Sequence, residues 1–163
     1  PPEEKVRASA HAQTVTEEYV YSLQTPEAKT FKREMAGAFA YLIDHYRRMA
    51  KRLHAHSRVL YPAGTHSPMI AFLLFEEALV RRQLDGTEKR GFQTGAEFGG
   101  AFEPSEAMTV SVATGERGET LPLRVTLDNP NRPQEEMYLD PEKLEELKDF
   151  YLELHHDDTT AED

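Results

Sequence analysis

Three histidines come closest, by type and spacing, to forming a metal site: His54, His56 and His66. Two histidines and a third ligand that leave one coordination position open would suit zinc or iron. On a helix, residues two positions apart point about 200° away from each other, so His54 and His56 converge only where a helix has ended. No HExxH motif is present. A metal-dependent hydrolase that uses these histidines is therefore an alternative hypothesis, while our main prediction includes no metal and no cofactor.

Other residues that could act in catalysis occur in patterns that favour structural roles. Carboxylates recur at i, i+4 near the C-terminus, as in Glu142 and Glu146. A solvated helix face does not separate the pKa values of neighbouring carboxyl groups, which acid–base catalysis requires. No GxSxG motif presents a serine nucleophile, and the chain has no cysteine. Since no motif defines a reaction, we favour a protein that is not an enzyme.

The strongest local anomaly is a cluster of cations formed by Arg47, Arg48, Lys51 and Arg52 and extended by Arg58. The spacing i, i+1, i+4, i+5 places the first four on one side of a helix. Such a face can pair with acidic residues of the same molecule or of a neighbouring subunit, contact an acidic protein partner, bind phosphates, or remain solvated. It lacks the interleaved aromatic residues on which bases stack. We predict that these five residues contact a partner.

The charges of the chain are strongly segregated. The last 29 residues, from Glu135 to Asp163, carry twelve acidic residues against two lysines, which equals the net charge of −10 of the whole chain. The segment from His45 to Arg90 has a net charge of +5. Separated charges create directional fields that orient a protein toward its partners. A dedicated DNA-binding protein would be basic overall, so nucleic acid ranks behind a protein partner.

Three predicted helix starts share one signature, a capping side chain followed by proline: Thr25-Pro26, Ser67-Pro68 and Asp140-Pro141. The first signature predicts a helix from Pro26 to about His56. An apolar stripe at heptad-like spacing runs along this helix and consists of Met35, Phe39, Leu42, Tyr46, Met49 and Leu53. We interpret the stripe as one face of a globular core, with a coiled coil to a second chain as the alternative.

The second signature predicts a helix from Pro68 to about Leu84 that ends before Gly86. Its residues from Met69 to Phe75 are apolar on nearly all sides, which is typical of a buried helix. Polar residues return from Glu76 onward, so we expect the C-terminal half of this helix, including Arg81, to reach solvent.

The remainder of the chain is predicted to form a small sheet and a last helix. Glycines interrupt the aromatic residues of 91–102, which fits either a broken strand pair or a flexible loop. Apolar and polar residues alternate over 108–113 and 121–127, which predicts a β-hairpin with one buried face. A short strand over 136–139 and a helix from Pro141 to about His155 follow.

These elements predict an α+β fold with a long N-terminal helix, a buried second helix, an antiparallel sheet of two to four strands, and a C-terminal helix that packs back. The length of 163 residues fits one domain over 25–155, between a partly ordered segment 1–24 and an acidic tail 156–163. No apolar run approaches the ~18 residues of a membrane span. The absence of cysteine fits a reducing compartment. We therefore expect a cytoplasmic protein without membrane contact.

The predicted function is non-catalytic protein–protein interaction or assembly, with a basic helix face and an acidic C-terminal third. This function fits three classes of protein equally: a small subunit of a larger assembly, a viral or phage accessory protein, and an inhibitor-like protein. The partner can be another protein or a second copy of the chain. The alternatives are the metal-dependent hydrolase above and a nucleic-acid-binding accessory protein that uses the face from Arg47 to Arg58.

Overall fold

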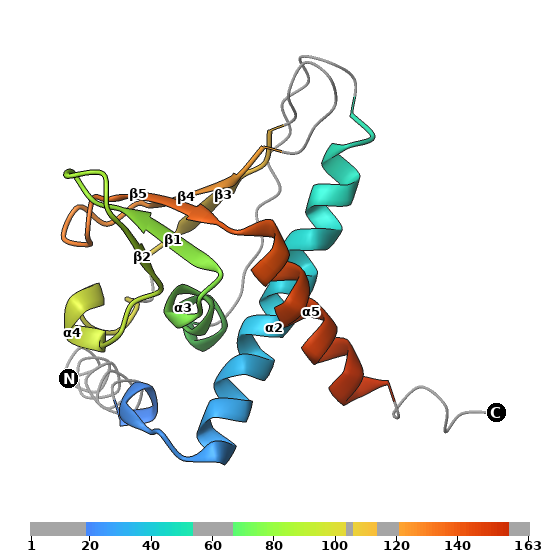
Figure 1. Ribbon diagram of the computed structural model, residues 1–163, viewed down its shortest axis with the longest axis horizontal. Helices are drawn as coiled ribbons and strands as arrows, with labels where there is room; N and C mark the ends of the chain where they lie inside the picture. Colours follow the sequence, from blue (N-terminus) through green and yellow to red (C-terminus); the bar gives the residue numbers. More distant parts are fainter. Residues whose placement is uncertain (1–18, 54–66, 104–105, 114–120, 157–163) are drawn as a thin grey trace, which may run out of the picture.

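The computed structural model describes residues 19–53, 67–103, 106–113 and 121–156 and confirms the α+β fold. A long helix, α2 (Pro26–Ala50), and a C-terminal helix, α5 (Pro141–His155), lie beside each other at one end of a five-stranded sheet (Figure 1). A shorter helix, α3 (Ser67–Phe75), contacts both α2 and the sheet. The predicted segment 1–24 and the predicted tail 156–163 lie mostly outside the described residues. A helical turn at 19–22 precedes α2.

Two of the predicted helix starts are confirmed by their capping contacts. The Thr25 hydroxyl accepts a hydrogen bond from the N–H of Ala28 at 3.2 Å. The Asp140 carboxylate accepts hydrogen bonds from the N–H groups of Glu142 and Lys143. A proline follows each cap, where its missing N–H leaves no partner unsatisfied. The observed α2 ends at Ala50, earlier than the predicted end near His56, which lies outside the described part of the chain.

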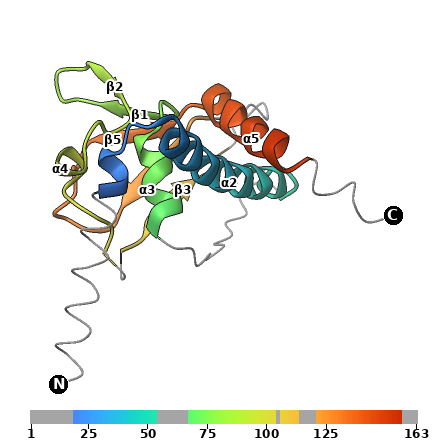
Figure 2. The same cartoon turned by 90° about the horizontal axis from the view of Figure 1, so that it is seen from below.

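The buried face of α2 differs from the predicted stripe. Its most buried residues are Phe39 of the stripe and five residues that do not belong to the six, namely Ala36, Gly37, Ala40, Ile43 and Asp44. Of the six stripe residues only Phe39 is fully buried, whereas the others are half-buried or, like Leu53, exposed. Small residues let α5 approach closely: a Cβ on Gly37 would lie 2.5 Å from the carbonyl oxygen of Leu147. Figures 1 and 2 both show α5 alongside α2.

The second helix is shorter than predicted, because its predicted C-terminal half is a strand. Helix α3 ends at Phe75, and strand β1 (Leu79–Arg82) begins four residues later. The N–H of Phe92 donates to the carbonyl oxygen of Leu74 at 3.0 Å and so satisfies a terminal carbonyl of α3. Gly91, with φ of +53°, lies so close to Phe75 that any Cβ would meet the Phe75 carbonyl oxygen at 2.7 Å. Contacts with residues that are distant in sequence therefore end this helix.

The sheet is antiparallel throughout and has five strands in the order β2-β1-β5-β4-β3. The strands beyond β1 are β2 (Glu88–Arg90), β3 (Met108–Ser111), β4 (Leu123–Leu127) and β5 (Glu136–Leu139). The predicted hairpin is the β3–β4 pair, and the predicted short strand is β5. The count exceeds the predicted two to four, because β1 and β2 form a further hairpin around Gly86.

One face of the sheet packs on the helices and the other is open among the described residues. Leu79, Leu123 and Leu139 stand in one register row on the inner face, and all three are completely buried. A row on the outer face crosses all five strands as Arg90, Val80, Tyr138, Arg124 and Ser111. These outer residues are exposed or half-buried.

The glycine-rich segment forms a short helix, which corrects both the strand and the loop interpretations. Helix α4 (Gly95–Phe98) is capped by the Thr94 hydroxyl, which accepts from the N–H of Glu97, and it ends at Gly99 in a left-handed conformation. Phe98 and Phe92 from this segment join the main core. None of the helices among the described residues combines the length and hydropathy that a bilayer span requires.

Candidate interaction surface

The C-terminal end of α2 carries the predicted cation cluster, and a buried acid organises it. Asp44 is only 2% exposed and lies three and four residues before Arg47 and Arg48. Its Oδ1 accepts from Arg47 Nη2 at 2.7 Å, and its Oδ2 accepts from Arg48 Nε at 2.8 Å. Each guanidinium makes a second hydrogen bond to the same oxygen. One carboxylate thus fixes the directions of two arginines.

Helix α5 supplies the rest of this network. Lys148, whose side chain is buried, lies 3.3 Å from Asp44 Oδ2 and also pairs with Glu145 on its own helix. Burial by itself would raise the pKa of Asp44, but hydrogen bonds from Arg48, Arg47 and Lys148 outweigh it and lower the pKa to about 2. For Lys148, burial lowers the pKa, and the two carboxylates more than compensate, so its pKa is raised. The network therefore holds its charges at neutral pH.

Pairing with the acidic C-terminal third uses only part of the cation cluster. Among the described residues, the cluster reaches α5 through one ion pair, Arg47 to Glu145 at 4.0 Å. Arg48 remains 61% exposed in its side chain despite its bond to Asp44. Lys51 and Arg52 are exposed and form no ion pair with the described residues. Arg58 lies outside the described ranges.

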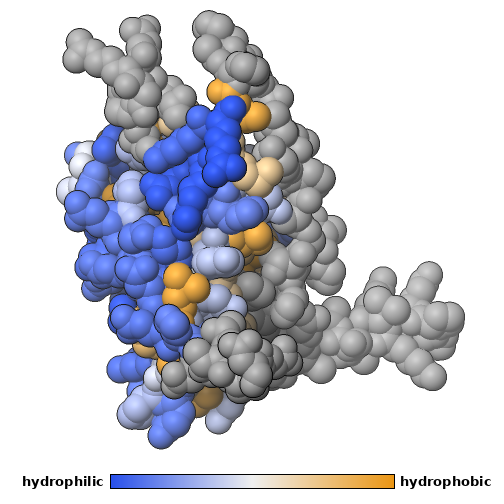
Figure 3. Space-filling model, turned by 90° about the vertical axis from the view of Figure 1, so that its right-hand side faces the viewer, coloured by the Kyte–Doolittle hydropathy of each residue, from blue (hydrophilic) through white to orange (hydrophobic). Residues whose placement is uncertain are grey.

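Arg48, Lys51 and Arg52 are hereafter the basic patch. They occupy the last turn of α2 and the residues just after it, where the helix dipole also favours cations. Near them are the half-buried Met49 in the last turn of α2 and the exposed Leu53 after the helix. Arginine and methionine beside an apolar residue resemble the composition of protein interfaces. Figure 3 shows the side of the molecule that carries α2 and α5, where the coloured surface is mostly hydrophilic with scattered hydrophobic spots.

The candidate metal-site histidines cannot be placed, because His54, His56 and His66 all lie outside the described residues. The structure does place His155, near the C-terminus. Its Nε2 lies 2.9 Å from Glu34 Oε1, and this contact joins α5 to α2. Within the described ranges, no group of three or more His, Cys, Asp or Glu residues is arranged to hold a metal ion. The hydrolase hypothesis therefore remains a prediction from sequence.

Two arginines, Arg132 and Arg81, are buried although the sequence did not predict it. Arg132, 4% exposed, forms an ion pair with Glu106 at 2.5 Å and donates to the carbonyl oxygens of Phe98, Gly100 and Ala101. Its guanidinium also lies 4.3 Å from the centre of the Phe98 ring. This arginine ties the α4 segment to the loop before β5. No signal in the sequence distinguishes Arg132 from a surface arginine, because its partners are 26 or more residues away.

Arg81 contradicts the prediction that its segment reaches solvent. It is 2% exposed on the inner face of β1, with its guanidinium 4.1 Å from the centre of the Phe92 ring. It pairs with Glu97 at 2.5 Å and Glu135 at 3.3 Å. These two carboxylates come from α4 and from the residue before β5, so Arg81 joins three parts of the chain.

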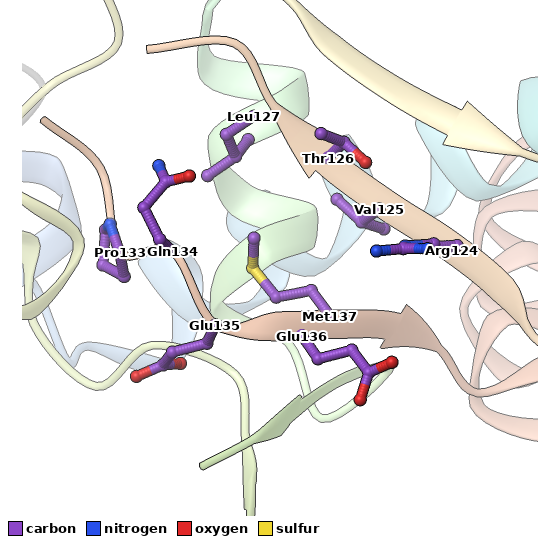
Figure 4. A pocket seen from close by; sticks show the side chains of 9 residues that line it. All are labelled: Arg124, Val125, Thr126, Leu127, Pro133, Gln134, Glu135, Glu136 and Met137. Atoms are coloured by element: carbon purple, nitrogen blue, oxygen red, sulfur yellow. The ribbon is translucent and has the colours of Figure 1, made fainter. Parts of the chain in front are cut away.

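A small pocket lies between β4 and the segment that leads into β5. It has a volume of about 150 Å³ and is lined by Arg124, Val125, Thr126, Leu127, Pro133, Gln134, Glu135, Glu136 and Met137 (Figure 4). This pocket was not predictable from the sequence. It is lined by two segments, and the distance between them depends on where the pairing of β4 with β5 ends.

Comparisons with protein-family models, with curated proteins and with solved structures returned no match.

Proposed function

We propose that this protein is a non-catalytic interaction or assembly protein, and that its basic patch receives an acidic surface of a protein partner. The proposal rests on the cations at the end of α2, which acidic residues of the described part of the chain neutralise only in part. Lys51 and Arg52 have no acidic partner among the described residues, in a chain whose net charge is −10. Exposed charges of this kind steer association and select partners.

The neighbouring helix favours a protein over a nucleic acid. Helix α5 begins near the end of α2, where Arg47 lies 4.0 Å from Glu145, and its exposed or half-buried acids in this first half are Glu142, Glu145 and Glu146. A long polyanion that reached the basic patch would approach these carboxylates as well, and like charges at an interface oppose binding. A protein surface can present a small acidic area of matching size. The proposal includes a cytoplasmic location. It also includes three possible classes of protein: a subunit of a larger assembly, a viral or phage accessory protein, and an inhibitor.

The test compares two double charge reversals. The patch variant, Lys51→Glu with Arg52→Glu, removes the uncompensated cations and keeps Arg48 on Asp44. The matched control, Lys29→Glu with Lys89→Glu, changes the net charge equally at exposed positions on the first turn of α2 and on β2. Each tagged full-length protein is incubated with extract of the native host, and the bound proteins are quantified by mass spectrometry.

We expect one or more proteins with an acidic surface to be recovered by the parent and by the control and to be depleted at least tenfold with the patch variant. Nuclease treatment of the extract should leave this recovery unchanged. If the patch variant recovers the same proteins as the parent, the basic patch is not the contact surface. If nuclease treatment abolishes recovery, the nucleic-acid alternative takes its place. A change of oligomeric state specific to the patch variant would identify a second copy as the partner.

A further inference from the structure

The pocket beside β4 exists because one strand pairing ends early. The β4–β5 ladder stops at the pair Val125 and Met137. Strand β4 continues along β3 as far as Leu127, whereas Glu136 of β5 keeps its pairing with Arg82 of β1 and has no partner in β4. The two segments therefore diverge, and the gap of about 150 Å³ opens between them (Figure 4). An engineered protein cavity of about 150 Å³ binds benzene, so a gap of this size is large enough for one amino-acid side chain.

The surface of the pocket is mostly polar. Val125, Leu127 and Met137 belong to the buried face of their strands and border the pocket with little exposed surface. Arg124 belongs to the exposed face, directly opposite Tyr138 in the register. Figure 4 shows its guanidinium extending over the gap. An occupant with a negatively charged end would match the guanidinium of Arg124.

Of the three charged residues that line the pocket, Glu135 and Glu136 have oppositely charged partners among the described residues. Glu135 pairs with Arg81 of β1, and Glu136 lies 3.6 Å from Arg82 and accepts a hydrogen bond from the Tyr138 hydroxyl. Figure 4 shows both carboxylates turned away from the gap. Arg124 forms no ion pair and no hydrogen bond with any described residue. Among the described residues, Arg124 is therefore the one charge of the pocket lining without an oppositely charged partner.

We propose that this pocket binds one acidic side chain of a polypeptide partner, with the carboxylate on Arg124. A guanidinium binds a carboxylate through two parallel hydrogen bonds, which a neutral amide cannot reproduce. The volume admits a glutamate or aspartate side chain. This site is distinct from the basic patch, and the proposal does not rest on the proposed function.

The test is a titration of the full-length protein, followed by amide and arginine Nε–H NMR signals. The probes are acetyl-glutamate amide, its neutral analogue acetyl-glutamine amide, and inorganic phosphate. We expect acetyl-glutamate amide, at millimolar concentration, to shift the signals of Arg124, Gln134 and Met137, and acetyl-glutamine amide to shift them little. Arg124→Gln should weaken the binding at least tenfold. Arg52→Gln, which removes a cation of the basic patch, should leave it unchanged.

Several outcomes would overturn the proposal. Equal shifts by the glutamate and glutamine probes would show that charge does not drive the binding. Unchanged affinity in Arg124→Gln, or a loss in Arg52→Gln instead, would place the site elsewhere. Tighter binding of phosphate than of acetyl-glutamate amide at the same residues would assign the pocket to a free oxyanion. The thermal midpoint of Arg124→Gln, expected to equal that of the parent because Arg124 is exposed, verifies that the variant is folded.

Discussion

The carboxylate of Asp44, buried between α2 and α5, holds the exposed guanidinium of Arg48 one turn further along α2. A buried acid thus determines the position of a surface cation. The same carboxylate binds Arg47 and contacts Lys148, so the packing of the two helices and the orientation of the cation cluster depend on one residue. An acidic substitution at Arg48 would place a second negative charge against Asp44, which is why the patch variant changes only Lys51 and Arg52.

Asp44 should make stability depend on pH below about pH 5. Its pKa is about 2 in the folded protein against an ordinary value of 3.8, so the folded state binds fewer protons than the unfolded state. The stabilisation is therefore complete above the unfolded pKa and is lost as the pH falls toward 2; it amounts to about 2 kcal/mol. Urea denaturation of the parent and Asp44→Asn at pH 7, 5, 4 and 3 measures it.

The difference in unfolding free energy between the parent and Asp44→Asn should shrink as the pH falls from 5 to 3. Other carboxyl groups with lowered pKa values, such as Glu106 and Glu97, titrate in both proteins and cancel in the difference. A difference that does not vary over this range would show that Asp44 does not titrate with a lowered pKa.

Gly37→Ala should destabilise the protein, although the same change in an isolated helix is worth about 1 kcal/mol of stabilisation. The added methyl group would lie 2.5 Å from the Leu147 carbonyl oxygen and 2.8 Å from the Tyr151 Cβ, and α5 would have to move. We expect a loss of roughly 1–3 kcal/mol in thermal or chemical denaturation. Gly95→Ala is the control, because its methyl group meets Tyr21 at an ordinary 3.6 Å. Equal stability of the two variants would contradict the close packing of α2 and α5.

Arg132→Lys should cost far more stability than Arg82→Lys. A lysine cannot replace the planar set of donors that reaches Glu106 and three backbone carbonyls, and Glu106 would remain buried with an incomplete partner. Breaking a buried pair costs roughly 3–5 kcal/mol, whereas exposed pairs contribute about 0–1 kcal/mol. Arg82 and Glu88 are both about half exposed. Denaturation midpoints that fall equally for both variants would refute the structural role of Arg132.

Phe72→Ala should lower the unfolding free energy by roughly 3–5 kcal/mol, since Phe72 is 2% exposed and contacts Tyr21 and Phe31. Phe75 is only partly buried, although its ring packs on Tyr21 and Phe92, so Phe75→Ala should cost less. Parent-like melting of Phe72→Ala would mean that α3 is not central to the core.

Much of the fold was predictable from local signals. Cap-plus-proline pairs placed the starts of α2 and α5, and alternation placed β3, β4 and β5, because capping and period-2 patterning depend on neighbouring residues. The end of α3 was not predictable in this way. An apolar run fits a buried helix or a buried strand equally, and hydrogen bonds from Phe92 and packing of Gly91 decide where α3 stops.

The candidate surfaces likewise include features that the sequence predicts and features that depend on tertiary contacts. The spacing of Arg48, Lys51 and Arg52 identified the basic patch, whereas the burial of Asp44 depends on α5, some hundred residues later. The burial of Arg81 and the position of Arg124 at a gap follow from tertiary contacts, so composition alone suggests only surface arginines.

The association rate constant of the recovered partner, measured against ionic strength, tests whether the basic patch engages an acidic protein. For the parent, we expect the rate to fall about tenfold or more between 20 and 200 mM salt, because steering by exposed charges is screened. With the Lys51→Glu, Arg52→Glu variant, association should be slower at low salt and nearly independent of salt, while the Lys29→Glu, Lys89→Glu control should behave as the parent. The same rate and the same salt dependence in the parent and the patch variant would contradict the claim.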